Sequence, residues 1–260
     1  MRKNLVIAAV GDESVHAAWL TGGDRSFDLA LIYFGDQTER YADQADFYQA
    51  RKGIKFSLLH EALTGSLAPL LARYEYIWMP DDDIAASAAQ IDRLFQLAHQ
   101  HRLAICQPAI GQGDVSFAAL RAAPAYVLRY SQFVEIMCPL FSREALARVL
   151  PTFTANVSAW GIDWLWASMY GPEDLAVIDE VAVNHTRPLQ SGGVHRRLAA
   201  LGVDPDQEHR QLMAKHGINN RRIHKAMCRG TARLRGIRID GRTTWTRSWL
   251  AAALKLRSAR

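Results

Sequence analysis

The sequence predicts an α/β fold in which a mostly parallel sheet is flanked by helices. Its first 185 residues alternate short apolar stretches with stretches of helical periodicity, which is the pattern of strand–helix–strand units. The strand-like stretches are largely apolar throughout, as is typical of parallel strands buried on both faces. The chain has 260 residues, of which 49% are hydrophobic and 22% charged, as in ordinary globular domains.

Three strands are expected in the first third of the chain, at residues 4–10, 27–36 and 75–79. Acidic residues stand at or just past the end of each. Because ligands bind beyond the carboxyl ends of parallel strands, we expect these carboxylates to converge on one edge of the sheet. The acidic residues and the glycines beside them are Gly11, Asp12, Gly35, Asp36 and Asp81–Asp83.

The next elements follow in chain order. Apolar residues at i, i+3, i+4 and i+7 predict an amphipathic helix over residues 91–98. Ser142 offers an N-cap for a second helix, which Pro151 closes. Further strands are expected at residues 103–108, 133–141 and 175–185.

Residues 196–260 predict a basic helical extension to a domain that spans residues 1–195. Residues 190–260 hold 16 Lys and Arg against 4 Asp and Glu, a net charge of +12, whereas the rest of the chain carries −7. This asymmetry indicates either an anionic partner or a solvated helical surface. The last stretch, residues 246–260, suits an amphipathic helix that lies on an anionic membrane surface or packs on the domain.

The cysteines and the apolar runs bear on the compartment. Cys106, Cys138 and Cys228 lack the spacing of a disulfide framework or a zinc site. The apolar run near the N-terminus is too short for a signal peptide, and no run of 18 apolar residues predicts a membrane span. We therefore expect a cytoplasmic protein, with peripheral contact to the inner face of the cell membrane through its basic C-terminus.

The three consecutive aspartates are the first candidate site. In an extended segment, Asp81 and Asp83 point to one side and Asp82 to the other. Carboxylate oxygens suit Mg²⁺ or Mn²⁺, which complete their coordination with water and substrate phosphates. The alternative is an acidic turn that caps a helix beginning near Ala85.

Asp163 is the second candidate, because it stands among Trp160, Trp164 and Trp166. Aromatic surroundings raise the pKa of a carboxyl group and shape a pocket for a sugar ring. This setting suits a general base. The alternative is an aspartate hydrogen-bonded at the start of a helix.

Three further residues complete the set. His185 follows a predicted strand and is either a metal ligand supplied from far along the chain or a turn histidine. Glu135 stands in an apolar run, needs a partner if buried, and is the second candidate for a catalytic carboxylate. Lys55 is a candidate for contact with phosphates.

Taken together, these stretches resemble domain-of-unknown-function family 707, whose bacterial and plant members are regarded as glycosyltransferase-like. The resemblance runs from about residue 4 to residue 215. It is carried by eight stretches in the same order: VGDESVHAAWL, FDLALIYFGD, KGIKFSLL, YEYIWMPDDDI, ICQPAI, FVEIMCPLFSREAL, WGIDWLW and VIDEVAVNHTRP.

The resemblance implies a GT-A-like, Rossmann-like fold and an inverting, metal-dependent glycosyltransferase. A nucleotide sugar, with a UDP-sugar the expected donor, would glycosylate a glycan or lipid-linked acceptor in cell-surface polysaccharide biosynthesis. The Asp-x-Asp motif would bind the ribose and, through Mn²⁺ or Mg²⁺, the diphosphate. By position, Asp81 would face the ribose or the metal, Asp83 and His185 would serve the metal, and Asp163 would be the base. Asp82 would belong with Asp81 and Lys55 among the donor-binding residues, and Gly11, Asp12 and Asp36 would line the base and ribose pocket.

Other functions stay open. The same aspartates would serve a metal-dependent phosphohydrolase or nucleotidyltransferase, although the sequence has no P-loop. A non-catalytic nucleotide- or glycan-binding protein is the other alternative. We do not expect nucleic-acid binding, because the basic tail lacks interleaved aromatic residues apart from Trp245 and Trp249.

Overall fold

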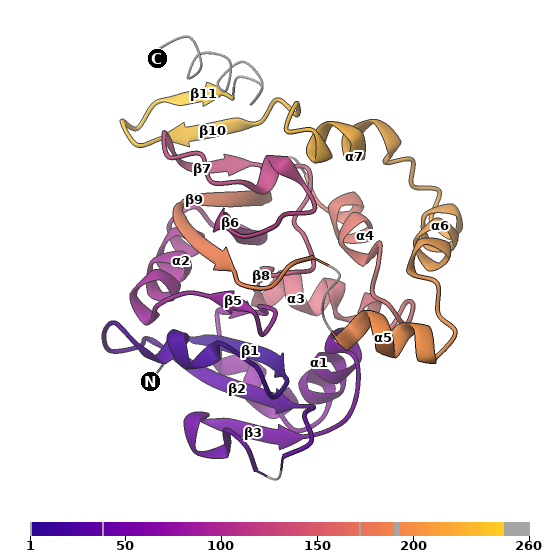
Figure 1. Cartoon of the computed structure of the whole chain (residues 1–260). Helices are drawn as coiled ribbons and strands as arrows, with labels where there is room; N and C mark the ends of the chain where they lie inside the picture. Colours follow the sequence, from indigo (N-terminus) through magenta and orange to yellow (C-terminus); the bar gives the residue numbers. More distant parts are fainter. Residues whose placement is uncertain (1, 38, 172, 190–192, 247–260) are drawn as a thin grey trace.

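The computed structural model describes residues 2–37, 39–171, 173–189 and 193–246, with no side-chain description for residues 193–196. Within these ranges, eleven strands form one sheet with helices on its faces (Figure 1). The predicted α/β class is confirmed. No helix among the described residues is long and apolar enough to cross a membrane.

The elements have the following bounds. The strands are β1 (Asn4–Val10), β2 (Phe27–Tyr33), β3 (Phe47–Ala50), β4 (Tyr76–Trp78), β5 (Ile84–Ala85), β6 (Ile105–Gln112), β7 (Tyr126–Tyr130), β8 (Leu140–Ser142), β9 (Leu175–His185), β10 (Arg235–Arg238) and β11 (Thr243–Trp245). The helices are α1 (Lys55–Thr64), α2 (Ala88–Gln100), α3 (Arg143–Val149), α4 (Ile162–Met169), α5 (Gly193–Ala200), α6 (Pro205–Lys215) and α7 (Arg221–Cys228). The short 3₁₀ helices are η1 (His16–Leu20), η2 (Ala42–Gln44), η3 (Ala68–Arg73), η4 (Ala118–Leu120) and η5 (Leu150–Thr152).

The sheet has the order β11-β10-β7-β9-β6-β8-β4-β1-β2-β3, and β5 pairs with β9. Its longest ladders, β1 with β2 and β6 with β9, are parallel, whereas β8 lies antiparallel between β4 and β6. Strands β1, β2, β4, β6 and β9 therefore point their carboxyl ends to the same edge. The segment β3-β2-β1-β4 has part of the strand order of a doubly wound sheet, with a switch point between β1 and β4.

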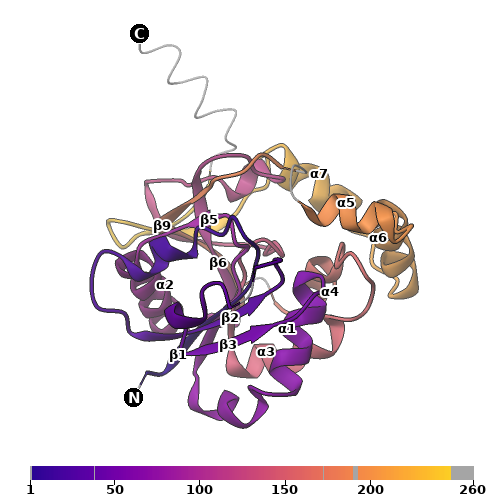
Figure 2. The same ribbon diagram turned by 60° about the horizontal axis from the view of Figure 1, so that its bottom comes forward.

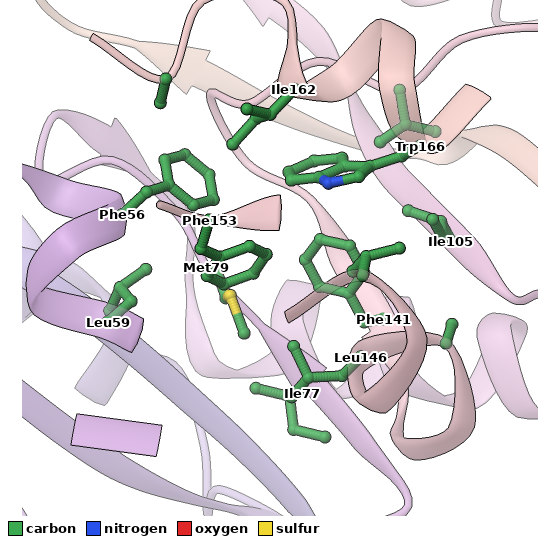
Figure 3. Packing of buried hydrophobic residues seen from close by; sticks show 14 of the residues in the cluster. Phe56, Leu59, Ile77, Met79, Ile105, Phe141, Leu146, Phe153, Ile162 and Trp166 are labelled. Atoms are coloured by element: carbon green, nitrogen blue, oxygen red, sulfur yellow. The ribbon is translucent and has the colours of Figure 1, made fainter. Parts of the chain in front are cut away.

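Two apolar layers cover the sheet. Successive residues of β1 point to opposite faces, so Leu5 and Ile7 belong to one layer and Val6 and Ala8 to the other. The first layer includes residues of α1, α3 and α4, and Figure 3 shows Phe56 and Trp166 among its aromatic rings. The second includes α2 and η1. At about 25 cal/mol per Å² of buried apolar area, this burial is the main favourable contribution to folding.

Helix α2 settles one alternative reading of the aspartates. Its N-cap is Ser87, whose side chain and that of Gln90 form a reciprocal capping box. Residues 84–85 form strand β5 instead. The interpretation of the aspartates as caps of a helix that begins near Ala85 is therefore wrong. The amphipathic helix at residues 91–98 and the Ser142 N-cap of α3 are confirmed.

Strand β6 begins and ends later than the strand predicted at residues 103–108, and two regions differ more. The strand expected at residues 133–141 is reduced to β8, because residues 133–139 form an irregular loop. In the C-terminal region, α5, α6 and α7 are helical, and α6 packs against α4 (Figure 2). Residues 235–245, however, form the strands β10 and β11, which extend the sheet beyond β7. The helix expected at residues 246–260 falls almost entirely on residues outside the described ranges, and the division at residue 195 stays a prediction.

Candidate active site

A cavity of about 540 Å³ opens at the carboxyl ends of β4 and β9. Six of the predicted site residues line it, although they come from segments far apart in the chain. Strand β4 leads into the aspartates, β9 ends in the histidine, and the other side chains come from the starts of α1 and α4 and from the loop before β8. The six residues are Lys55, Asp81, Asp83, Glu135, Asp163 and His185.

The three aspartates divide as the sequence predicts, with Asp82 apart from the other two. Asp81 and Asp83 line the cavity, and Asp82 does not. The Asp82 Oδ2 atom accepts a hydrogen bond of 2.8 Å from the Gly11 N–H, which joins the end of β4 to the end of β1. The backbone here is a turn, closed by a hydrogen bond from the Ile84 N–H to the Asp81 carbonyl at 3.2 Å. The alternation therefore arises in a turn and not in the extended segment that we expected.

Each aspartate faces a basic side chain of its own. Lys55 Nζ lies 2.7 Å from Asp81 Oδ1, an Arg187 guanidinium nitrogen lies 3.0 Å from Asp82 Oδ1, and His185 Nε2 lies 3.4 Å from Asp83 Oδ2. Our sequence reading missed Arg187. A signal for it existed, because Arg187 follows His185 by two residues, and residues at that spacing share a side of extended backbone.

The two ring nitrogens of His185 have different partners. Nδ1 lies 3.0 Å from the Asp114 carbonyl oxygen, which only accepts hydrogen bonds, so Nδ1 carries a proton. Nε2 is thereby presented to Asp83. The hydrogen bond with Asp83 raises the pKa of His185 to about 9, against the opposing effect of burial. Burial acts to raise the pKa of Asp83, but His185 and Arg187 outweigh it and lower that pKa.

Glu135 and Asp163 form an acidic pair in the cavity wall. Burial, and then the proximity of Glu135, raises the pKa of Asp163 to about 8. Burial also raises the pKa of Glu135 to about 7. Asp163 Oδ1 accepts a hydrogen bond of 2.9 Å from the Trp164 N–H, so it is also hydrogen-bonded at the start of α4. Glu135 Oε2 is buried and has no hydrogen-bond partner among the described residues.

The aromatic residues around Asp163 divide into two groups. Trp160 and Trp164 line the cavity, and the Trp164 ring stacks on Phe133 with centroids 4.2 Å apart. Trp166 points into the apolar layer instead, and its indole N–H donates to Thr152 Oγ1 at 2.8 Å. One wall of the cavity is thus an aromatic surface next to the acidic pair.

The C-terminal helices supply another wall, which our sequence reading did not foresee. It consists of Leu198 of α5, Asp206 and His209 of α6, and His224 and Cys228 of α7. Nothing in the local sequence of these helices marks them as cavity residues, because their position depends on how α6 packs against α4.

Gly11, Asp12 and Asp36 do not reach the cavity. The Tyr33 hydroxyl donates to the Asp12 carboxylate, and Lys52 pairs with Asp36. A Cβ atom on Gly11 would lie 2.9 Å from the Phe34 ring, so this part of the edge is filled by protein atoms. Of the carboxylates expected to converge on this edge, Asp81 and Asp83, which follow the third predicted strand, therefore line the cavity. The first strand is connected to them only by the Gly11–Asp82 hydrogen bond.

Metal binding at this site would depend on few protein ligands. Among the described residues, no three His, Cys, Asp or Glu side chains are grouped as a ready metal site. Asp83 and His185 nevertheless have suitable atoms: Asp83 Oδ1 is buried without a hydrogen-bond partner in the described part of the chain, and His185 Nε2 faces the same carboxylate. Oxygen and imidazole ligands fit Mn²⁺ or Mg²⁺, which retain water and substrate oxygens in their coordination.

Comparison with known proteins gives structural similarity only. No family model matches the chain, and no curated protein matches it. A crystal structure of S. aureus TarS matches with a TM-score of 0.46 and 13% identity, over 84% of this chain and 43% of that one. A structure of TarS residues 1–349 gives 0.46 and 14%, over 80% and 69%. This chain thus spans less than half the length of the first TarS chain.

Proposed function

We propose that the chain is a metal-dependent glycosyltransferase of GT-A type, related to domain-of-unknown-function family 707. It would transfer a sugar from a nucleoside diphosphate donor to a glycan or lipid-linked acceptor in cell-surface polysaccharide biosynthesis. The observation that carries the proposal is that one cavity holds two sets of carboxylates with different partners. Asp81 and Asp83 face the basic side chains of Lys55 and His185, although burial also raises the pKa of Asp81 to about 6. Glu135 and Asp163 form no ion pair among the described residues, and burial raises their pKa values further, to about 7 and about 8.

The first set suits the diphosphate end of the donor. Asp83 and His185 would hold Mn²⁺ or Mg²⁺, with Asp81 beside them. When bound, the metal would neutralise the charge that develops on the departing diphosphate. Lys55 and Arg187 add fixed positive charge at the same end of the cavity. A UDP-sugar is the donor we propose.

The second set suits the acceptor. A general base works best when its pKa lies near the operating pH, and the pKa of Asp163, at about 8, meets that condition. The hydrogen bond from the Trp164 N–H fixes the orientation of this carboxylate. Glu135 is the second candidate, with a pKa of about 7. Each pKa belongs partly to the pair, because the two groups interact.

The proposed reaction is a single displacement with inversion. The acceptor oxygen forms a bond to the anomeric carbon while the bond from that carbon to the diphosphate oxygen breaks. The acceptor proton passes to Asp163, and the nucleoside diphosphate departs with the bonding electron pair. Trp160 and Trp164, which line the cavity, would provide an apolar surface for a sugar ring.

The test is a thermal-shift screen of nucleoside diphosphates and nucleotide sugars, with and without Mn²⁺. We expect stabilisation that requires Mn²⁺ and is lost in Asp83→Ala. Asp24→Ala is the matched control, because Asp24 is exposed and does not line the cavity. Absence of any nucleotide response in the wild-type protein would overturn the proposal. Nucleotide cleavage that needs no acceptor would favour the phosphohydrolase alternative.

A further inference from the structure

We infer that Lys55 exchanges one hydrogen-bond partner when ligands bind. Its ammonium group pairs with Asp81 when the cavity is empty. When a divalent cation occupies the site, Lys55 releases Asp81 and donates that hydrogen bond to the diphosphate of the donor. This inference rests on the proposed function. It assigns Lys55 a role in coupling the binding of two ligands, beyond that of a fixed positive charge.

The first observation is how the three aspartates are paired. Asp81 forms an ion pair with Lys55 and Asp82 with Arg187, whereas Asp83 faces His185, whose imidazole would coordinate a cation in its neutral form. A divalent cation held by Asp83 and His185 would therefore find the other two carboxylates already paired. Use of a second aspartate as a ligand requires its basic partner to release that carboxylate.

Lys55 is the group best placed to do so. Its partner Asp81 has a side chain 39% exposed, against 12% for Asp82 and 15% for Asp83. The Asp81 carboxylate is thus the most accessible of the three from the cavity. Arg187, by contrast, pairs with Asp82, whose carboxylate does not line the cavity.

The hydrogen bonds of Lys55 show which of its contacts can change. An ammonium group has three N–H donors. Two of them reach the carbonyl oxygens of Ile136 at 2.8 Å and Met137 at 3.0 Å, and the third reaches Asp81. The two carbonyls anchor the ammonium group at the cavity wall, so only the third donor needs a new acceptor. A phosphate oxygen in the cavity would supply it.

The exchange would couple the binding of the metal and the diphosphate. A cation alone has to displace the ammonium group and leave one donor unpaired, whereas a diphosphate alone has to compete with Asp81 for that donor. When both bind, the cation compensates the Asp81 carboxylate and the diphosphate accepts the hydrogen bond from Lys55. Coupling between two ligands must be reciprocal and typically amounts to 5–150-fold in affinity, so we expect about a tenfold effect.

The experiment measures Mn²⁺ binding without nucleotide and UDP binding at saturating Mn²⁺, by calorimetry, in the wild-type protein and in Lys55→Met. We expect Lys55→Met to bind Mn²⁺ alone about tenfold more tightly and UDP about tenfold more weakly. Loss of the Mn²⁺ signal in Asp83→Ala assigns that signal to this site. If Lys55 had only a structural role, Lys55→Met would bind both Mn²⁺ and UDP more weakly, and that outcome would contradict the inference.

Lys52→Met is the matched control. Lys52 makes an equivalent set of contacts, to the carbonyls of Phe34 and Gly35 and to Asp36, but does not line the cavity. Lys52→Met removes the same charge and should change neither the Mn²⁺ affinity nor the UDP affinity. If Lys55→Met does not fold, Lys55→Gln retains an amide donor for the carbonyls and serves instead.

The outcomes separate the two proposals. A wild-type protein that binds Mn²⁺ but no UDP contradicts the proposed function and the diphosphate half of the exchange. Wild-type binding of both ligands, with Mn²⁺ affinity unchanged in Lys55→Met, leaves the function standing and overturns the exchange alone.

Discussion

His185 Nε2 lies 3.4 Å from Asp83 Oδ2, while Nδ1 of the same ring donates to the Asp114 carbonyl at 3.0 Å. The ring, at the end of β9, is thereby fixed between the segment that follows β6 and the turn that follows β4. Because the folded-state pKa is raised from 6.5 to about 9, the protonated imidazole stabilises the fold. That stability is fully present below about pH 6.5 and is lost as the pH rises through about 9.

We therefore predict that His185→Gln, in metal-free buffer, destabilises the protein at pH 6 and much less at pH 10. The difference in free energy of unfolding is roughly 3 kcal/mol at most, because one pKa unit corresponds to about 1.4 kcal/mol. Urea unfolding at pH 6, 8 and 10 measures it. His216→Gln, at an exposed position, is the control. If the loss of stability is the same at all three pH values, the pairing of His185 with Asp83 is not its cause.

Asp163→Asn should have the opposite effect on stability. The pKa of this buried carboxyl is raised from 3.8 to about 8, so its burial destabilises the fold progressively as the pH rises from about 4 through 8. Asparagine has no such titration and still accepts the Trp164 N–H. We predict that the variant is more stable than the wild type at pH 8, on the order of 1 kcal/mol or more, and equally stable at pH 4.

The same variant separates a catalytic from a structural carboxyl. As a general base, Asp163 should be worth roughly 10²–10⁴ in turnover, so Asp163→Asn should retain Mn²⁺-dependent nucleotide binding and lose transfer. If Asp163 had only a structural role, the variant would retain both nucleotide binding and transfer. Normal turnover in Asp163→Asn, with loss in Glu135→Gln, would assign the base to Glu135.

The strands were the most predictable part of the fold. Residues 4–10 and 175–185 match β1 and β9 to the residue, because both stretches are rich in buried aliphatic side chains. Residues 133–139 are equally apolar but form a loop, since burial against the cavity and the core does not require strand pairing. Strand β10 was not predicted, because its sequence RGIR has no apolar run and its pairing with β7 depends on residues far away in the chain.

The candidate site was predictable to the extent that its residues follow strands. Asp81, Asp83 and His185 stand at the carboxyl ends of β4 and β9, and the parallel topology brings such ends together. Asp12 and Asp36 follow the same rule, yet local partners from Tyr33 and Lys52 occupy them. Side-chain packing of this kind has no signature in the order of the strands.

Gly161 connects the acidic pair to the C-terminal helices. Its φ of +94° is a conformation that favours glycine, and a Cβ atom would lie 2.8 Å from His209 Cδ2. We predict that Gly161→Ala combines backbone strain of about 1–2 kcal/mol with a displacement of α6. Gly202→Ala is the matched control, because its φ is +68° but no atom lies within 4 Å of the added Cβ.

Both glycine variants should therefore lower the melting temperature, and Gly161→Ala should lower it more. Hydrogen exchange in α6 distinguishes them further: it should increase in Gly161→Ala and not in Gly202→Ala. Equal effects of the two substitutions would show that α6 does not depend on the close approach to Gly161.

Arg129 and Asp179 form a buried ion pair away from the cavity, with Nε and Oδ2 2.7 Å apart. The guanidinium also donates to the carbonyls of Ala119 and Arg121, and Asp179 Oδ1 accepts the Ala123 N–H. The Asp179 carboxylate is fully engaged in this network. Its role is to join β7, β9 and the loop around η4.

Removing one member of this pair should cost far more than neutralising both. Arg129→Met leaves a buried carboxylate without its cation, a change that typically costs about 3–5 kcal/mol. In Arg129→Met/Asp179→Asn no charge is buried, and the asparagine oxygen can still accept the Ala123 N–H. We therefore predict that the double variant is more stable than Arg129→Met, and that lowering the pH from 8 to 5 narrows the gap, because Asp179 can then take up a proton. Urea unfolding at the two pH values measures this, and a double variant no more stable than Arg129→Met at pH 8 would contradict the argument.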